Sequence, residues 1–216
     1  MEAKWFRVLT VCAGVVLAGS AAAVAVDPVV VEPDDYPANT VLNDACPGVT
    51  LTALGDYSGR DGNVYARISS ITSTGSQVFG SSWGISFIEW GFDSSFQPHL
   101  RVDFDSLVMW VAVDAIGNNS EDYGRMEVYD AGGTLLGSFE TAMLSVGDVE
   151  TMAFSTPSPS IGYVLLGGKD PGTVPHHTVC LDNLQYVVPE PATLSLLTVC
   201  AVVLIRRKRP GLARRA

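Results

Sequence analysis

The stretch Leu107-Val108-Met109-Trp110-Val111-Ala112-Val113 decides the fold class. Apolar side chains fill both alternating faces, as in a central β-strand that is covered on both sides. Between residues 41 and 187 no stretch keeps the spacing of three and four residues that an amphipathic helix requires. Short runs rich in Val, Ile, Tyr, Phe and Thr alternate instead with clusters of Gly, Asn, Asp and Ser. We therefore expect an all-β domain.

Ten segments, this one included, have the composition of strands: residues 49–53, 64–71, 84–92, 99–104, 107–113, 125–130, 134–140, 150–155, 161–167 and 178–186. The turn Asp130-Ala131-Gly132-Gly133 predicts a hairpin between two of them. Short, regularly spaced strands with Gly-rich turns predict a single β-sandwich over residues 45–187. An N-terminal signal helix and a C-terminal hydrophobic helix would flank it.

The first 25 residues are typical of a secretory signal peptide. Lys4 and Arg7 precede an apolar run over residues 8–17, and Ala23-Val24-Ala25 offers a cleavage site. Residues 26–44 contain three prolines and several acids, which predicts an extended and weakly ordered leader. The sandwich is expected to follow this leader.

The C-terminal end begins with the box Val188-Pro189-Glu190-Pro191 and continues with an apolar run over residues 192–205. The basic cluster Arg206-Arg207-Lys208-Arg209 follows, and under the positive-inside rule it keeps the terminus in the cytoplasm. This order resembles the PEP-CTERM sorting signal of bacterial surface proteins, over residues 188 to about 209. An ordinary tail anchor is the alternative, although 14 helical residues span only about 21 Å of a ~30 Å hydrocarbon core.

The resemblance implies a route for the chain. Signal peptidase would remove residues 1–25, and an exosortase-type processing enzyme would recognise the box. The chain would be anchored transiently in the inner membrane and then reach the cell surface or the extracellular matrix.

A second resemblance covers residues 45 to 187. The runs Arg101-Val102-Asp103-Phe104, Met126-Glu127-Val128-Tyr129 and Leu181-Asp182-Asn183-Leu184 are similar to the jelly-roll domains that PEP-CTERM proteins often carry, and to carbohydrate-binding modules. This resemblance implies a non-enzymatic surface protein with weak affinity for extracellular polysaccharide. The alternative is a jelly-roll carbohydrate-active enzyme, of the glycoside hydrolase or lyase type.

No residue is assigned a catalytic role. Gly80-Ser81-Ser82-Trp83-Gly84 matches the hydrolase pattern Gly-x-Ser-x-Gly, but that pattern works on a turn from a strand into a helix. Residues 85–90 predict a strand instead. Trp83 is the candidate for stacking on a sugar ring, whereas Trp110 is expected in the core.

The charge of the exported body limits its partners. Residues 26–187 contain five basic and 21 acidic side chains, a formal net charge of −16. Repulsion from phosphates therefore argues against nucleic acid as a partner.

Cysteine usage suggests one disulfide. Cys46 and Cys180 lie near the two ends of the body, in a compartment where disulfides persist, so we expect a Cys46–Cys180 bridge. Two buried free thiols are the alternative.

A calcium site depends on the same pairing. If the first and last strands were antiparallel with Cys46 opposite Cys180, Asp44 would lie opposite Asp182. Two facing carboxylates repel unless a cation or hydrogen-bond donors lie between them. A structural calcium held by Asp44, Asp182 and Asn183 is one solution, and two solvated acids are the other.

Overall fold

The computed structural model describes residues 27–55, 61–82, 84–90, 99–169 and 178–189. They form twelve strands and a short 3₁₀ helix: β1 (Val29–Val31), η1 (Pro33–Asp35), β2 (Val49–Leu54), β3 (Val64–Ile68), β4 (Gln77–Ser81), β5 (Phe87–Trp90), β6 (His99–Val108), β7 (Trp110–Gly117), β8 (Gly124–Tyr129), β9 (Leu135–Glu140), β10 (Val149–Ser155), β11 (Ile161–Lys169) and β12 (Thr178–Val187). None of these ranges contains an α-helix. Within them no helix has the length and apolar composition needed to span a bilayer.

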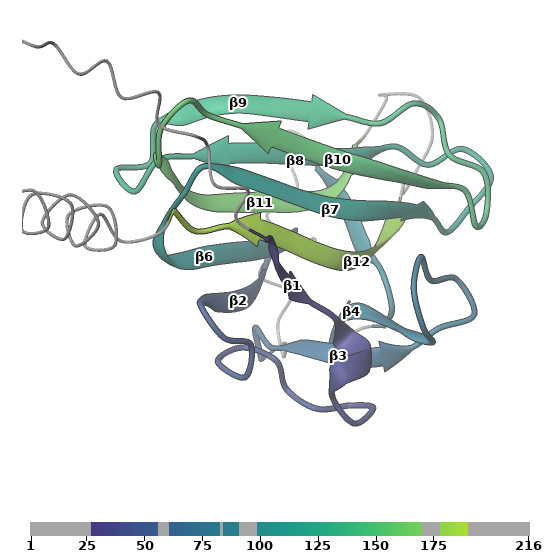
Figure 1. The fold of residues 1–216 in the computed structure, drawn as a ribbon. Coiled ribbons are helices and arrows are strands. Elements are labelled where there is room, and N and C mark those ends of the chain that lie inside the picture. Colours follow the sequence, from purple (N-terminus) through teal and green to yellow (C-terminus); the bar gives the residue numbers. More distant parts are fainter. Residues whose placement is uncertain (1–26, 56–60, 83, 91–98, 170–177, 190–216) are drawn as a thin grey trace, which may run out of the picture.

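The strands form two sheets. In sheet A, β7 lies between β10 and β12, while β1, β4 and β5 pair with β12 and β3 pairs with β4. Sheet B has the order β2-β6-β11-β8-β9. Every pairing between these strands is antiparallel except the short contact of β5 with β11, through which β5 joins the two sheets. Figure 1 shows β7, β10 and β12 in front of β6, β8 and β11.

One hydrophobic core fills the space between the sheets. Sheet A contributes alternate residues of β7 and β12, and sheet B those of β6, β8 and β11. The fully buried members of these strands include Val111, Val113, Ala115, Val179, Leu181, Leu184, Leu100, Val102, Met126, Val128, Val164 and Leu166. The predicted all-β, two-sheet architecture is confirmed. The two flanking helices that the sequence predicts lie outside the described residues.

The stretch over residues 107–113, from which the fold class was predicted, passes from sheet B to sheet A. Leu107 and Val108 end β6 in sheet B, and Trp110 begins β7 in sheet A. Val111 and Val113 enter the core, so β7 is central as predicted, but Trp110 is only half-buried and does not belong to the core. The prediction that Trp110 is a core residue is wrong because alternation from Val111 turns its side chain to the outer face of sheet A.

The expectation of a weakly ordered leader is also wrong. Residues 29–31 form β1 and pair with residues 184–186 of β12. One of the acids that suggested a solvated leader binds backbone instead: Asp34 accepts hydrogen bonds from the backbone N–H groups of Ser76 and Gln77. The segment is ordered because β1 pairs with β12 and because Asp34 binds the backbone N–H groups at the start of β4.

Candidate functional site

The outer face of sheet B carries a row of polar and aromatic side chains. Alternation in β6, β8 and β11 sends one set of residues into the core and the other set outward. The register aligns Asp103, Tyr163 and Tyr129 in one row across the three strands. Arg101 and Glu127 belong to the next row, on either side of the half-buried Leu165.

An arginine and two tyrosines from these two rows form a stack across β6, β11 and β8. The rings of Tyr129 and Tyr163 are parallel within 7°, with centroids 4.8 Å apart. The guanidinium of Arg101 lies 4.0 Å from the centroid of Tyr163. Asp103 accepts two hydrogen bonds from that guanidinium, at 2.7 Å from Nε and 2.6 Å from Nη2, and these bonds raise the pKa of Arg101. A bidentate pair of this kind fixes the arginine against the ring.

Hydrogen bonds and ion pairs connect the two tyrosines to β9. The Tyr129 hydroxyl donates to Glu127, which is 8% exposed and also accepts from Arg125 Nε at 3.1 Å. Burial, followed by this bond to Glu127, raises the pKa of Tyr129 to about 12. Arg125 Nη1 lies 3.0 Å from Glu140 Oε1, and Lys169 Nζ donates to Glu140 Oε2.

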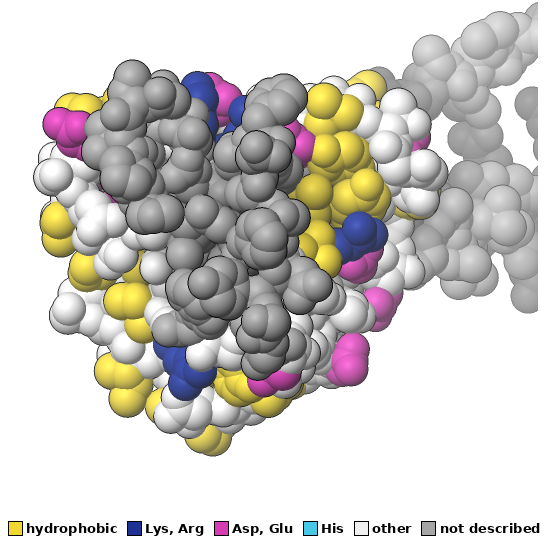
Figure 2. Space-filling view, turned by 180° about the vertical axis from the view of Figure 1, so that it is seen from behind, with side chains coloured by type: hydrophobic (Ala, Val, Ile, Leu, Met, Phe, Trp, Pro, Cys, Tyr) yellow, Lys and Arg dark blue, Asp and Glu magenta, His cyan; other side chains and the backbone are white. Residues whose placement is uncertain are grey.

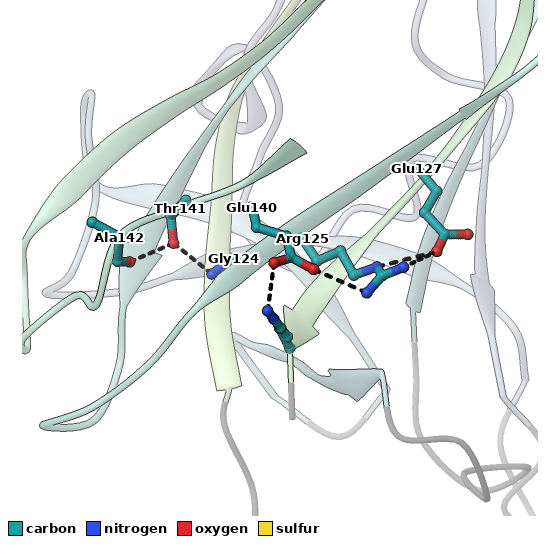
Figure 3. Close-up of polar contacts among 7 residues, drawn as sticks. Gly124, Arg125, Glu127, Glu140, Thr141 and Ala142 are labelled. Atoms are coloured by element: carbon teal, nitrogen blue, oxygen red, sulfur yellow. Dashed lines mark hydrogen bonds and ion pairs between the residues drawn. The ribbon is translucent and has the colours of Figure 1, made fainter. Parts of the chain in front are cut away.

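Figure 3 shows Arg125 between Glu127 and Glu140, with Thr141 close by. The Thr141 hydroxyl accepts from the Gly124 N–H at 2.8 Å and donates to the Ala142 carbonyl at 2.7 Å. Thr141 therefore fixes the ends of β8 and β9 next to the charged groups. We call the eight connected residues the outer strip: Arg101, Asp103, Arg125, Glu127, Tyr129, Glu140, Tyr163 and Lys169.

The outer strip holds three of the four basic side chains in the described part of the chain. Figure 2, viewed from behind, shows basic and acidic side chains beside a group of hydrophobic ones, a class that there includes Tyr. All three of its carboxylates accept hydrogen bonds from a cation. Such a rigid, polar and partly exposed surface is suited to binding.

The predicted calcium ligands are not brought together. Asp182 is fully buried, and its Oδ2 accepts from the backbone N–H groups of Ser73 at 3.0 Å and Thr74 at 3.1 Å, and from the Ser73 hydroxyl at 3.0 Å. Its Oδ1 accepts from the Asn183 N–H at 2.9 Å. A cation at Asp182 would have to displace these donors. No group of three or more His, Cys, Asp or Glu side chains in the described ranges is arranged to hold a metal.

The predicted register of Asp44 is wrong. Asp182 lies opposite Asp114 of β7, and β12 pairs at its C-terminal half with β1 rather than with a strand containing Asp44. Asp44 is exposed on the turn before β2, which belongs to sheet B. The Asn183 side-chain amide donates to Asp114 at 3.0 Å. The two facing acids, Asp114 and Asp182, are therefore held by hydrogen-bond donors rather than by a cation.

The predicted Cys46–Cys180 disulfide is not formed. Both thiols are free and buried. Cys46 belongs to the large core between the sheets, whereas Cys180 packs with Val78 and Ile116 in a separate cluster on the other face of sheet A. Burial, followed by the charges of Asp122 and Asp182, raises the pKa of Cys180 to about 12. The sheet itself keeps the two sulfurs apart.

The remaining predicted residues are placed only in part. Val188, directly after β12, packs against the core, and Pro189 is half-buried. Outside the described residues lie the sugar-stacking candidate Trp83, the end of the box (Glu190 and Pro191) and the basic cluster (Arg206, Arg207, Lys208 and Arg209). Ser81 ends β4 and forms a bridge with Gly84, and the next element is β5. The strand predicted after the Gly-x-Ser-x-Gly match is therefore present.

Comparison with known proteins finds likeness to solved structures only. No family model matches the chain, and no curated protein matches it. The chain is similar to the crystal structure of the K2 cleaved adhesin domain of Lys-gingipain, with 13% sequence identity and a TM-score of 0.46. The likeness covers 75% of this chain and 100% of that one. At this level it indicates neither a shared function nor a shared ligand.

Proposed function

We propose that this chain is an exported, surface-displayed β-sandwich protein that binds carbohydrate weakly and has no catalytic activity. Its N-terminal 25 residues direct export, and its C-terminal segment is a PEP-CTERM signal read by an exosortase-type enzyme. The order of elements supports this division. β12, the last strand of the sandwich, ends at Val187, and the box begins at the next residue.

The outer strip carries the binding part of the proposal. It joins four strands of sheet B through ion pairs and an Arg–Tyr–Tyr stack, which orders its side chains before a ligand arrives. Preordered polar groups lose less conformational entropy on binding than mobile ones. Arginine and carboxylate groups also hydrogen-bond readily to sugar hydroxyls, which both donate and accept. An extracellular polysaccharide is the partner that we assign to this face.

The absence of catalysis is tested against the enzyme alternative. The full chain, solubilised in detergent, is screened on a glycan array and then incubated with each bound polysaccharide. We expect binding without release of reducing ends or unsaturated products. Turnover of any polysaccharide would replace the proposed binding protein with a jelly-roll carbohydrate-active enzyme.

The sorting part needs a separate test. In a host that contains an exosortase, the chain with Glu190→Gln and Pro191→Ala is expected to stay membrane-bound, while the native chain reaches the surface. A chain with Pro175→Ala, outside the box, serves as the control. Equal delivery of all three chains would favour an ordinary tail anchor.

A further inference from the structure

The charges of the outer strip cancel among themselves. Its three cations, Arg101, Arg125 and Lys169, form ion pairs with its three carboxylates. The exported body around it has a formal net charge of −16. A polyanion would meet repulsion from the body, and each cation of the strip is already paired with a carboxylate that would also repel it. The charge pattern therefore favours an uncharged ligand.

The aromatic ring faces of the outer strip are largely covered by its own side chains. Tyr163 lies on β11 between β6 and β8, so Arg101 approaches it from one side, at 4.0 Å from its centroid, and the parallel ring of Tyr129 from the other, at 4.8 Å. A ring covered on both faces has none left for a sugar. Only the second face of Tyr129 is outside the stack, so recognition has to rely mainly on the edges of these groups.

Those edges offer donors and acceptors side by side. Arg101 uses Nε and Nη2 for Asp103, and its Nη1 has no acceptor in the described part of the chain. Each oxygen of Asp103 accepts one of these bonds and retains further acceptor capacity. Both side chains are about one-third exposed, at 33% and 37%. Adjacent donors and acceptors match the neighbouring hydroxyls of a sugar ring, because a hydroxyl does both.

The strip runs across the strands. It begins on β6 with Arg101, passes through Tyr163 on β11 and Tyr129 on β8, and ends on β9 with Glu140. Three strand spacings correspond to roughly 14 Å, the length of a few linked sugar rings.

We propose that the outer strip binds a neutral, hydroxyl-rich polysaccharide chain that lies across β6, β11, β8 and β9 and is held by hydrogen bonds at the edges of the Arg–Tyr–Tyr stack. This inference rests on the proposed carbohydrate-binding function and names its ligand class and its site.

The first experiment compares neutral polymers with charged derivatives of the same backbone. The full chain in detergent is titrated with neutral glucan, mannan and galactan, and with the carboxymethylated form of each, at low and at high sodium chloride. We expect at least one neutral polymer to bind about tenfold more tightly than its carboxymethylated form at low salt. The affinity for the neutral polymer should not change with salt.

Matched variants locate the site. Arg101→Gln and Tyr163→Phe are compared with Arg67→Gln and Tyr65→Phe, because Arg67 also lies over a tyrosine, 4.5 Å from the Tyr65 centroid, but on β3. We expect Arg101→Gln to weaken neutral-polymer binding about tenfold and Tyr163→Phe severalfold, with both β3 variants unchanged. Thermal melts of all four verify folding.

The outcomes separate the two claims. No binding to any polysaccharide overturns the proposed function itself. Binding that is equal for neutral and carboxymethylated polymers leaves that function standing and overturns the neutral ligand class. Neutral binding that survives Arg101→Gln and Tyr163→Phe overturns the assignment of the outer strip.

Discussion

Asp182 of β12 lies opposite Asp114 of β7, and neither carboxylate forms an ion pair in the described part of the chain. Asn183 lies between them in the network: its N–H donates to Asp182, and its side-chain amide donates to Asp114 at 3.0 Å. Asn183 has a φ of 49°, at the point where the register of β12 shifts. Two facing acids are therefore stabilised by neutral donors, at the cost of one left-handed residue.

Removing the Asp182 carboxylate should destabilise the domain. In Asp182→Ala the backbone N–H groups of the half-buried Ser73 and Thr74 lose their buried acceptor, and we expect a loss of about 3 kcal/mol in the free energy of unfolding. Asp148→Ala, which removes an acceptor from an exposed turn, should cost less than about 1 kcal/mol. Urea denaturation measures both, and equal losses would contradict a special role of Asp182.

Calcium should not change the stability. The oxygens of Asp182 already accept protein donors, and Asp44 is exposed elsewhere. We expect the same melting temperature in calcium chloride and in chelator. A calcium-dependent rise that Asp182→Ala abolishes would restore the calcium site as predicted from the sequence.

Glu32 should make the domain less stable as the pH rises. Burial, together with the charges of Asp182, Asp34 and Asp35, raises its pKa above 4.5, although a hydrogen bond from Thr74 opposes this. The folded state then binds more protons than the unfolded state between pH 4.5 and the raised pKa. Stability from protonated Glu32 is present below that window and is lost as the pH rises through it.

The test of Glu32 is Glu32→Gln. We expect this variant to be more stable than the native chain at neutral pH and to lose part of the pH dependence, since a neutral amide still accepts from Thr74. Glu121→Gln removes the same charge from an exposed site and should change neither. A parallel pH profile of Glu32→Gln and the native chain would show that Glu32 is not responsible.

The two thiols should be free and unreactive. Cys46 and Cys180 are buried, and burial is the main cause that raises the pKa of each. A thiol with a raised pKa carries little thiolate at neutral pH, so we expect alkylation of both only in denaturant. Peptide mapping after alkylation measures this, and a reducing agent should leave the melting temperature unchanged. A linked Cys46–Cys180 peptide would contradict the structure.

Gly48 should tolerate no side chain. It has a φ of +76°, and a Cβ there would lie 2.4 Å from the Tyr186 hydroxyl oxygen, which is hydrogen-bonded to the Pro47 carbonyl at 2.8 Å. We expect Gly48→Ala to cost about 3 kcal/mol through strain and overpacking together. Gly147→Ala has a similar φ of +82° but open space, so it should cost about 1 kcal/mol. Thermal or urea unfolding compares the two.

The strand composition was readable because β-branched and aromatic runs separated by Gly and Asn carry a local signal. β2, β9 and β12 begin and end within one residue of the predicted limits. The sequence did not predict that the chain passes from sheet B to sheet A at Met109, since an apolar run has the same composition whether it stays in one sheet or enters the other. β4 (Gln77–Ser81) was missed because Gly80 and Ser81 have the composition of a turn.

The outer strip shows more clearly which contacts a single sequence does not predict. Arg101 and Asp103, and likewise Arg125 and Glu127, alternate in strands that the sequence predicted correctly. Their connection through Tyr163 depends on β11 lying between β6 and β8, with Tyr163 in register with Asp103 and Tyr129. Non-local register follows from tertiary packing, which a single sequence does not reveal. The Asp44–Asp182 and Cys46–Cys180 pairings were wrong for the same reason, because they assumed a register that the strands do not have.

β12 is the last strand of the described domain, and it pairs with β1, β4, β5 and β7. A chain made from its N-terminus therefore lacks the strand that joins most of sheet A until residues 178–187 have emerged. Sheet A can therefore form only after nearly all of the described chain has been made, so we expect fragments that end before residue 178 to remain unfolded.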